Sequence, residues 1–314
     1  MKIAALLCMV AGSVASCFAA TTTITKTNYH GWPNSYVMSN GTVEAIVVPA
    51  IGRVMQFRFV GEDSGPFFEN RAMDGKYPIP TSKEWGNFGG DKTWPSPQDD
   101  WPKVTPRSWP PPVAFDSMPV EASIEGESLR LTSAIDPDYG IRTERVISLG
   151  DRRFQMTIET TYHKVKGEPR KVGVWIITQL NEPEDVCIQN PGKFVRQSEQ
   201  LPLGFKEPAD GQTSIHLKRD PVKSTKIGTQ GNNLYWKDKK WWISITSPRI
   251  AGAEYPDQGS SAEVYTNPNP LTYVELEMLG PVKTLKVGDS IAQTNVYSLG
   301  RRQPAIAETE EEKK

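Results

Sequence analysis

The chain has 314 residues, which is enough for one large β domain or two small ones. Its 36 Lys and Arg residues are almost balanced by 37 Asp and Glu residues. A nucleic-acid ligand is therefore not expected, because nucleic-acid binders carry a basic surplus or a basic stripe. Beyond residue 20 no apolar stretch is long enough to cross a bilayer as a helix.

Residues 1–20 are predicted to be a secretory signal, because a positively charged start is followed by a short apolar run. Two cleavage sites compete. Residues 14–17 (Val-Ala-Ser-Cys) resemble the bacterial lipobox, which would leave Cys17 lipidated, whereas ordinary cleavage would follow Ala19 or Ala20. We expect an exported protein of the periplasm or cell envelope, with membrane attachment only through a lipid anchor at Cys17.

Most of the chain after this signal shows the two-residue apolar period of β-strands, with many β-branched or aromatic residues. In chain order, the predicted strands are 42–48, 53–60, 128–134, 141–147, 153–160, 172–178, 241–245, 262–265, 272–278 and 293–299. The strand at 172–178 is more continuously apolar than the others, so we expect it to be central. No long amphipathic helix is predicted.

A Trp- and Pro-rich segment interrupts this series. Four of the nine tryptophans fall between Trp85 and Trp109, among Gly, Pro, Asp and Lys residues, which predicts a long loop. An indole face suits the C–H face of a sugar ring, and polar neighbours suit its hydroxyls. The candidate carbohydrate-binding residues here are Asp91, Lys92, Trp94, Gln98 and Trp101. Two alternatives stay open, namely that the indoles pack on one another and that the Asp–Lys pair is an exposed ion pair.

The strands predict one large antiparallel β-sandwich or barrel, since no linker divides them into independent halves. Residues 303–314 are highly charged and are predicted to be a disordered, solvated tail. Cys187 is the only cysteine outside the export region, so no internal disulfide is expected, and we predict it to be a buried structural residue at the start of a strand.

Three segments resemble the galactose mutarotase-like, or aldose 1-epimerase-like, superfamily. Residues 47–57 resemble its opening strand–Pro–Gly–strand element, and residues 273–288 resemble its closing element, a Glu-bearing strand that turns into the final strand. Residues 89–98 resemble the signature of a bacterial branch, domain of unknown function 4380. The resemblance implies a β-supersandwich over residues 27–302 with a concave, sugar-binding face.

The resemblance also implies an acid–base pair, because mutarotation needs a base at the anomeric hydroxyl and an acid at the ring oxygen. In the aldose epimerases the base is a Glu on a late strand, a position that Glu275 matches, with Glu277 as the alternate. Both glutamates share one strand face with Tyr273, opposite an apolar face, so they are predicted to point outward. The alternative is a pair of solvated surface glutamates.

The family's acid is a His on a central strand, and residues 172–179 contain none. The three histidines of the chain are expected in surface, packing or structural roles: His30, His163 and His216. Trp175 and Gln179 are candidate binding residues on the central strand, and Asp91 or Lys92 is a candidate substitute for the acid. Arg71 is a candidate bidentate donor to vicinal hydroxyls or a carboxylate, with a surface ion pair as the alternative.

These observations predict an exported carbohydrate-binding protein. It would act either as a sugar 1-epimerase-like isomerase with Glu275 as base or as a glycan-binding module without turnover. A structural or interaction protein of the cell envelope is the alternative. No metal or cofactor is expected, since the sequence has no Cys/His cluster, phosphate-binding Gly-rich loop or nucleophile elbow.

Overall fold

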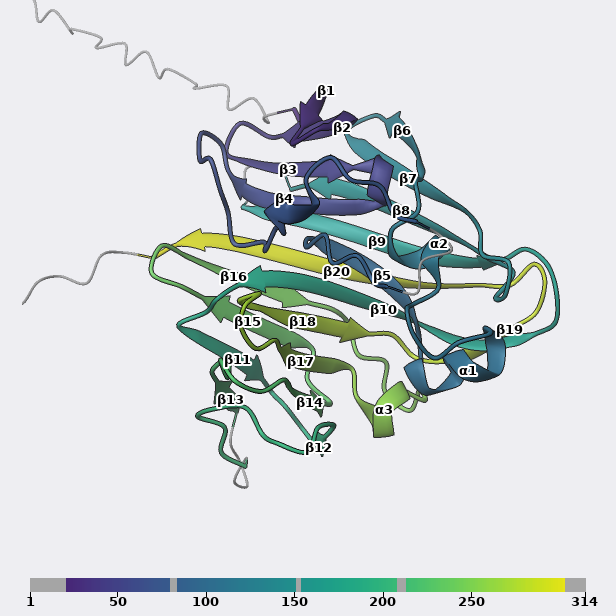
Figure 1. Cartoon of the computed structure of the whole chain (residues 1–314), viewed down its shortest axis with the longest axis vertical. Helices are drawn as coiled ribbons and strands as arrows, with labels where there is room; N and C mark the ends of the chain where they lie inside the picture. Colours follow the sequence, from purple (N-terminus) through teal and green to yellow (C-terminus); the bar gives the residue numbers. More distant parts are fainter. Residues whose placement is uncertain (1–20, 80–83, 151–153, 208–212, 303–314) are drawn as a thin grey trace, which may run out of the picture.

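The computed structural model describes residues 21–79, 84–150, 154–207 and 213–302. The predicted signal at 1–20 and the predicted tail at 303–314 lie outside these ranges. The described chain forms two large antiparallel sheets packed face to face, as Figure 1 shows. The prediction of an all-β sandwich is confirmed.

The first sheet contains most of the N-terminal strands and the strands that were predicted to carry the site. Its order is β1 (Thr23–Tyr29), β2 (Trp32–Ser39), β3 (Val43–Val48), β4 (Arg53–Phe59), β5 (Asp91–Ser96), β10 (Arg170–Asn181), β18 (Tyr273–Leu279), β17 (Ala262–Thr266), β14 (Thr225–Thr229) and β12 (Phe194–Arg196), with β19 (Lys283–Leu285) also pairing with β10. The position of β10 in the middle of the sheet confirms that the most apolar strand is central.

The second sheet covers one face of the first. Its order is β13 (Ser214–Leu217), β11 (Asp185–Gln189), β15 (Asn233–Lys237), β16 (Trp241–Thr246), β20 (Ser290–Arg301), β9 (Gln155–Lys164), β8 (Ile141–Leu149), β7 (Ser128–Ile135) and β6 (Glu121–Glu125). Cys187 lies in β11 and is buried, as predicted.

Helical elements are short and lie in the connections. They are η1 (Pro49–Ile51), η2 (Arg71–Met73), η3 (Gln98–Asp100), α1 (Trp101–Val104), α2 (Val113–Asp116) and α3 (Pro256–Gly259). No helix within the described ranges is long and apolar enough to cross a membrane.

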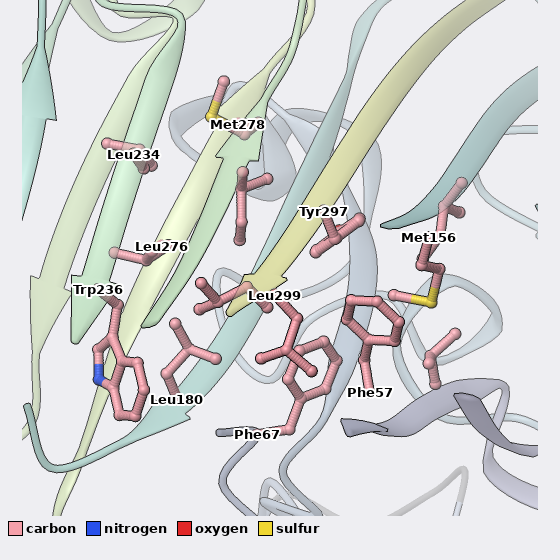
Figure 2. Packing of buried hydrophobic residues seen from close by; sticks show 14 of the residues in the cluster. Phe57, Phe67, Met156, Leu180, Leu234, Trp236, Leu276, Met278, Tyr297 and Leu299 are labelled. Atoms are coloured by element: carbon pink, nitrogen blue, oxygen red, sulfur yellow. The ribbon is translucent and has the colours of Figure 1, made fainter. Parts of the chain in front are cut away.

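Apolar side chains from the inner faces of both sheets interdigitate between them. Figure 2 shows Phe57 and Leu276 of the first sheet among Trp236, Met156 and Leu299 of the second, and all are buried. Burial of this apolar surface is the main favourable contribution to folding.

A buried polar layer also joins the two sheets. Asp91 of β5 points inward, where its carboxylate forms an ion pair with Arg145 of β8. The same carboxylate accepts hydrogen bonds from the hydroxyls of Thr178 at 2.7 Å and Tyr297 at 2.6 Å. Because both charged side chains are nearly inaccessible to water, each depends on the other to offset the cost of its burial.

The structure corrects one prediction for the Trp-rich segment, because Asp91–Ser96 forms the buried strand β5 and is not part of a loop. Pro95 is tolerated in this central strand because β4 pairs with β5 only at Val54 and Asp91, so few backbone N–H groups are needed on that side. Long irregular connections remain on both sides of β5.

We predict that Arg145→Met lowers the free energy of unfolding by about 3–5 kcal/mol, because it leaves the Asp91 carboxylate buried without a counter-charge. Urea denaturation measures this change. Lys103→Ala, which removes an exposed ion pair with Asp100, is the control and should change stability little. The combination of Arg145→Met with Asp91→Asn should recover part of the loss. A cost for Arg145→Met no larger than that of the control would contradict the prediction.

Candidate functional site

The outer face of the first sheet gathers most of the residues predicted for the site. Because side chains alternate along a strand, Lys92 and Trp94 of β5 point away from the core. Trp94 lies opposite Trp175 of β10, and Gln179 of β10 lies opposite Glu275 of β18. Glu275 and Glu277 both face outward, as the sequence predicts, but they are buried beneath other side chains and are not solvated surface glutamates.

Lys92 and Glu275 form the centre of this face. The Lys92 Nζ lies 3.3 Å from Glu275 Oε1, and Gln179 Nε2 donates to the same oxygen at 2.8 Å. Burial lowers the pKa of Lys92, and the Glu275 carboxylate opposes this shift. The Oε1 of Gln179 is buried without a hydrogen-bond donor, which leaves one unsatisfied acceptor beside the glutamate.

Five tryptophans pack against one another over Lys92. They are Trp85, Trp94, Trp101, Trp109 and Trp175, with ring centroids 5.4–6.5 Å apart in the contacting pairs. The Lys92 ammonium lies 4.9 Å from the ring centroid of Trp94, close enough for a cation–π interaction. Trp94 and Trp101 are therefore buried by other indoles, as the self-packing alternative holds, whereas Trp109 is 44% exposed.

Asp116 of α2 connects this tryptophan cluster to the sheet through hydrogen bonds. One of its carboxylate oxygens accepts from Trp94 Nε1 at 2.8 Å and from Arg53 Nη2 at 2.9 Å, and the other accepts from Trp85 Nε1 at 3.2 Å. Arg53 and Asp116 are both buried, so the carboxylate fixes two indoles through charge-assisted hydrogen bonds.

A second ionic centre lies around Lys226 of β14, which is two strands away from β18, the strand of Glu275. Its Nζ is 2.8 Å from Glu263 Oε2 and 2.8 Å from Glu277 Oε2, and it lies 4.6 Å from the ring centroid of Trp175. The Trp175 Nε1 donates to Glu277 Oε2 at 2.8 Å. This arrangement surrounds one ammonium group with two carboxylates and an aromatic face.

Carboxylates outnumber cations at this centre, because Asp257 of α3 lies beside Glu263. Burial raises the pKa of Glu277 to about 8, with Lys226 opposing the shift and Glu263 adding to it. Burial and the Glu263 carboxylate raise the pKa of Asp257 to about 7. Both groups can therefore change protonation state near neutral pH.

An open cleft of about 670 Å³ lies over this centre. Its lining includes Gln98, Asp99, Trp175, Lys226, Asp257 and Gln258. The lining residues come from η3, β10, β14, α3 and the end of β12 with the residues that follow it. Figure 1 shows α1, which follows η3, near the same end of the first sheet as α3. The cleft combines an aromatic side chain with amide, ammonium and carboxylate groups.

Of the predicted site residues, only Gln98 and Trp175 line the cleft over Lys226. Asp91 points into the sandwich, and Trp101 is covered by its neighbours. Arg71 lies on η2, where it contacts Asp74 and His30, in agreement with the surface ion-pair alternative. Sequence reasoning did not select Asp116, which stands in a short helix without a recognisable pattern.

Of the Lys226 centre, the sequence predicted Glu277 and Trp175 as site residues but not Lys226, Glu263 or Asp257. Glu263 lies in the predicted strand 262–265 with the outward alternation of a polar residue, which is a weak signal for a site. Lys226 and Asp257 lie in segments for which no element was predicted, so nothing in the sequence pattern brings them beside Glu277.

No protein-family model matches the sequence, and no curated protein matches it either. The fold, however, matches a class of known structures. It is similar to a galactose mutarotase-like protein from Lactobacillus casei, with a TM-score of 0.57 and 8% identity over 85% of this chain and 100% of that one. It is also similar to galactose 1-epimerase from Lactobacillus acidophilus, with a TM-score of 0.51 and 12% identity over 91% of this chain and 100% of that one.

A third similar structure is a TPR-domain containing protein from Parabacteroides distasonis. The TM-score is 0.60 with 15% identity, and the match covers 92% of this chain and 56% of the length of that protein. The fold of the chain is therefore the galactose mutarotase-like β-supersandwich, as the sequence resemblance predicts. Its assignment to the bacterial branch named above stays a prediction.

We predict that Glu277 makes stability depend on pH. Its pKa is about 8 in the folded chain against an ordinary value of 4.5, so the folded state binds this proton more strongly than the unfolded state. The stabilisation is complete at low pH and is lost as the pH rises towards 8 and above. When the pH is raised from 5 to 9, the free energy of unfolding should fall less for Glu277→Gln than for the wild type. The difference between the two decreases should be at least about 1 kcal/mol.

Urea denaturation at several pH values measures this difference. Glu62→Gln, which changes a carboxylate paired with Arg301 at the surface, is the matched control and should follow the wild type. A pH profile of Glu277→Gln that is parallel to the wild type would show that the Glu277 carboxyl group ionises normally.

Proposed function

We propose that the protein binds a carbohydrate in the cleft over Trp175 and Lys226. The observation that carries this proposal is the lining of the cleft, where amide, ammonium, guanidinium and carboxylate groups converge beside the nearly buried Trp175. A sugar needs several donors and acceptors for its hydroxyls, and these polar lining groups supply them. The volume of about 670 Å³ accommodates a small saccharide.

The fold supports a sugar as the ligand class. The similar structures from Lactobacillus species are named a galactose mutarotase-like protein and a galactose 1-epimerase. Their names describe those proteins, and the low identity limits the likeness to the fold. If residues 1–20 act as the predicted signal, binding would take place in the periplasm or cell envelope.

Sugar 1-epimerase-like activity is the second candidate, and the near-neutral pKa values of two carboxyl groups favour it. Glu277 and Asp257 can each accept or donate a proton, so Asp257 would supply the acid for which no histidine is present. Glu277 is hydrogen-bonded to the cleft residues Trp175 and Lys226, whereas Glu275 contacts Lys92 and Gln179, which are not cleft residues, and neither glutamate itself lines the cleft. The geometry therefore favours the alternate glutamate as the base.

Polarimetry on a sugar that binds separates this candidate from binding without turnover. Faster mutarotation that is lost in Asp257→Asn, with binding retained, would establish the enzyme. A rate equal to the uncatalysed one for every bound sugar would exclude it.

We predict that a titration of intrinsic tryptophan fluorescence gives a saturable response to at least one member of a panel of neutral and acidic saccharides. The double variant Gln98→Ala, Gln258→Ala removes two hydrogen-bonding groups from the cleft walls and should weaken binding by about 10-fold or more. Gln155→Ala, on the second sheet, is the matched control and should bind like the wild type.

Two results would contradict the proposed site. One is the absence of a saturable response across the panel, and the other is an affinity that is unchanged in the double variant. Circular dichroism of each variant confirms that a loss of binding is not a loss of folding.

A further inference from the structure

The outer face of the second sheet carries a separate cleft at its edge, formed by β11, β13 and β15. It has a volume of about 450 Å³, and its lining includes Asp185, Cys187, Ser214, His216, Tyr235 and Lys237. The alternate residues of these three strands belong to the apolar core between the sheets. The polar residues are therefore placed together by strand alternation and register, on the side of the molecule away from the Lys226 cleft.

Within this cleft a hydroxyl, an imidazole and a carboxylate are in series. His216 Nδ1 lies 3.0 Å from Asp185 Oδ2, and its Nε2 lies 3.4 Å from Ser214 Oγ. The Asp185 carboxylate therefore contacts one ring nitrogen of His216, and the other ring nitrogen is directed at the Ser214 hydroxyl. Serine hydrolases have the same sequence of contacts, from the nucleophile through the base to the orienting acid. The distance of 3.4 Å is longer than in an assembled complex, as is common before a substrate is bound.

The strand pairing fixes this order. Cys187 lies directly between His216 on one side and Tyr235 on the other, and Asp185 precedes it by two residues on the same face. Lys237 lies opposite Asp185, and its Nζ is 3.3 Å from Asp185 Oδ2. The His216 imidazole and the Lys237 ammonium thus contact the Asp185 carboxylate from the two neighbouring strands and hold this orienting residue in place.

The cleft also offers donors for a developing oxyanion. Gln189, Asn190 and Tyr235 line it, and amide and hydroxyl donors such as theirs are the type of group that stabilises the tetrahedral intermediate of acyl transfer. Burial raises the pKa of Tyr235, so its hydroxyl remains a donor at neutral pH. The Tyr235 ring stacks on Trp242 with centroids 5.7 Å apart, and Tyr235 lies opposite Cys187, on the other side of β11 from His216.

We propose that this second cleft is a hydrolytic site for carboxylic esters, with Ser214 as the nucleophile, His216 as the general base and Asp185 as the positioning residue. Ser214 Oγ attacks the carbonyl carbon while His216 Nε2 takes the hydroxyl proton. The C–O bond to the alcohol then breaks, and the alcohol leaves with that proton. Water then attacks the acyl-serine and gives a proton to His216, and His216 returns that proton to Ser214 Oγ as the C–Oγ bond breaks and the carboxylic acid leaves.

Cys187 is a weaker candidate for the nucleophile than Ser214. Burial raises the pKa of its thiol, and the thiolate is the reactive form of cysteine. His216 was expected to be structural from the sequence, but its side chain is 56% exposed and its contacts are those of a base. The proposal does not depend on carbohydrate binding, because the two clefts lie on opposite sheets.

The test uses two independent readouts on the full chain. The first is covalent labelling by a fluorophosphonate, followed by peptide mapping, and the second is hydrolysis of p-nitrophenyl acetate. We expect the label on Ser214, and we expect Ser214→Ala and His216→Ala to lose the label and to slow hydrolysis by about 100-fold. Asp185→Asn should retain the nucleophile and slow hydrolysis by about 10-fold or more.

Ser244→Ala is the matched control, because Ser244 lies opposite Tyr235 on the neighbouring strand β16. It should retain the label and the full rate. The proposal is overturned if the label maps to Cys187 or to any residue other than Ser214, or if Ser214→Ala hydrolyses the ester as fast as the control. Since these residues are on the surface of the sheet, thermal melting should show that all variants fold like the wild type. The proposal is supported if the wild type is labelled and folded Ser214→Ala is not.

Discussion

Two consecutive residues of β5 carry opposite charges to opposite faces of the first sheet, and the rest of the structure depends on how both are paired. Asp91 meets Arg145 of the second sheet, and Lys92 meets Glu275 of β18. Both β5 side chains are inaccessible to water. An unpaired charge at either place would cost several kcal/mol, and a slip of β5 by one residue would exchange the two charges between the faces. The two ion pairs therefore specify a single register for β5.

This register determines which side chains meet on the outer face of the first sheet. Once Lys92 is opposite β10 and beside Glu275, the next outward residue, Trp94, must contact Trp175. Trp175 in turn contacts Lys226 and Glu277, which connects the two ionic centres. The indoles thus serve as packing between charged groups more than as an exposed platform, and the open cleft lies where this packing ends, beside η3 and α3.

The sequence pattern allowed the strands and the sandwich to be predicted, because a two-residue apolar period directly reflects burial on one face. It also gave the outward direction of Glu275 and Glu277. It failed for β5, where polar residues face both sides and Gly and Pro residues flank them, so that no alternation is visible. The contacts that bury Asp91 and Lys92 span 54 and 183 residues of chain, and no local pattern records such pairings. Lys226 and Glu263 were missed for the same reason, although their partners Glu277 and Trp175 were predicted.

A double-mutant cycle on Lys92 and Glu275 tests most directly whether β5 is held by its buried charges. The free energy of unfolding is measured for Lys92→Met, Glu275→Gln and the double variant by urea denaturation. Because each residue offsets the burial of the other, the double variant should be more stable than the sum of the single effects predicts, by about 1–3 kcal/mol. Additive effects, with a coupling energy near zero, would contradict the account and would show that packing alone positions this strand.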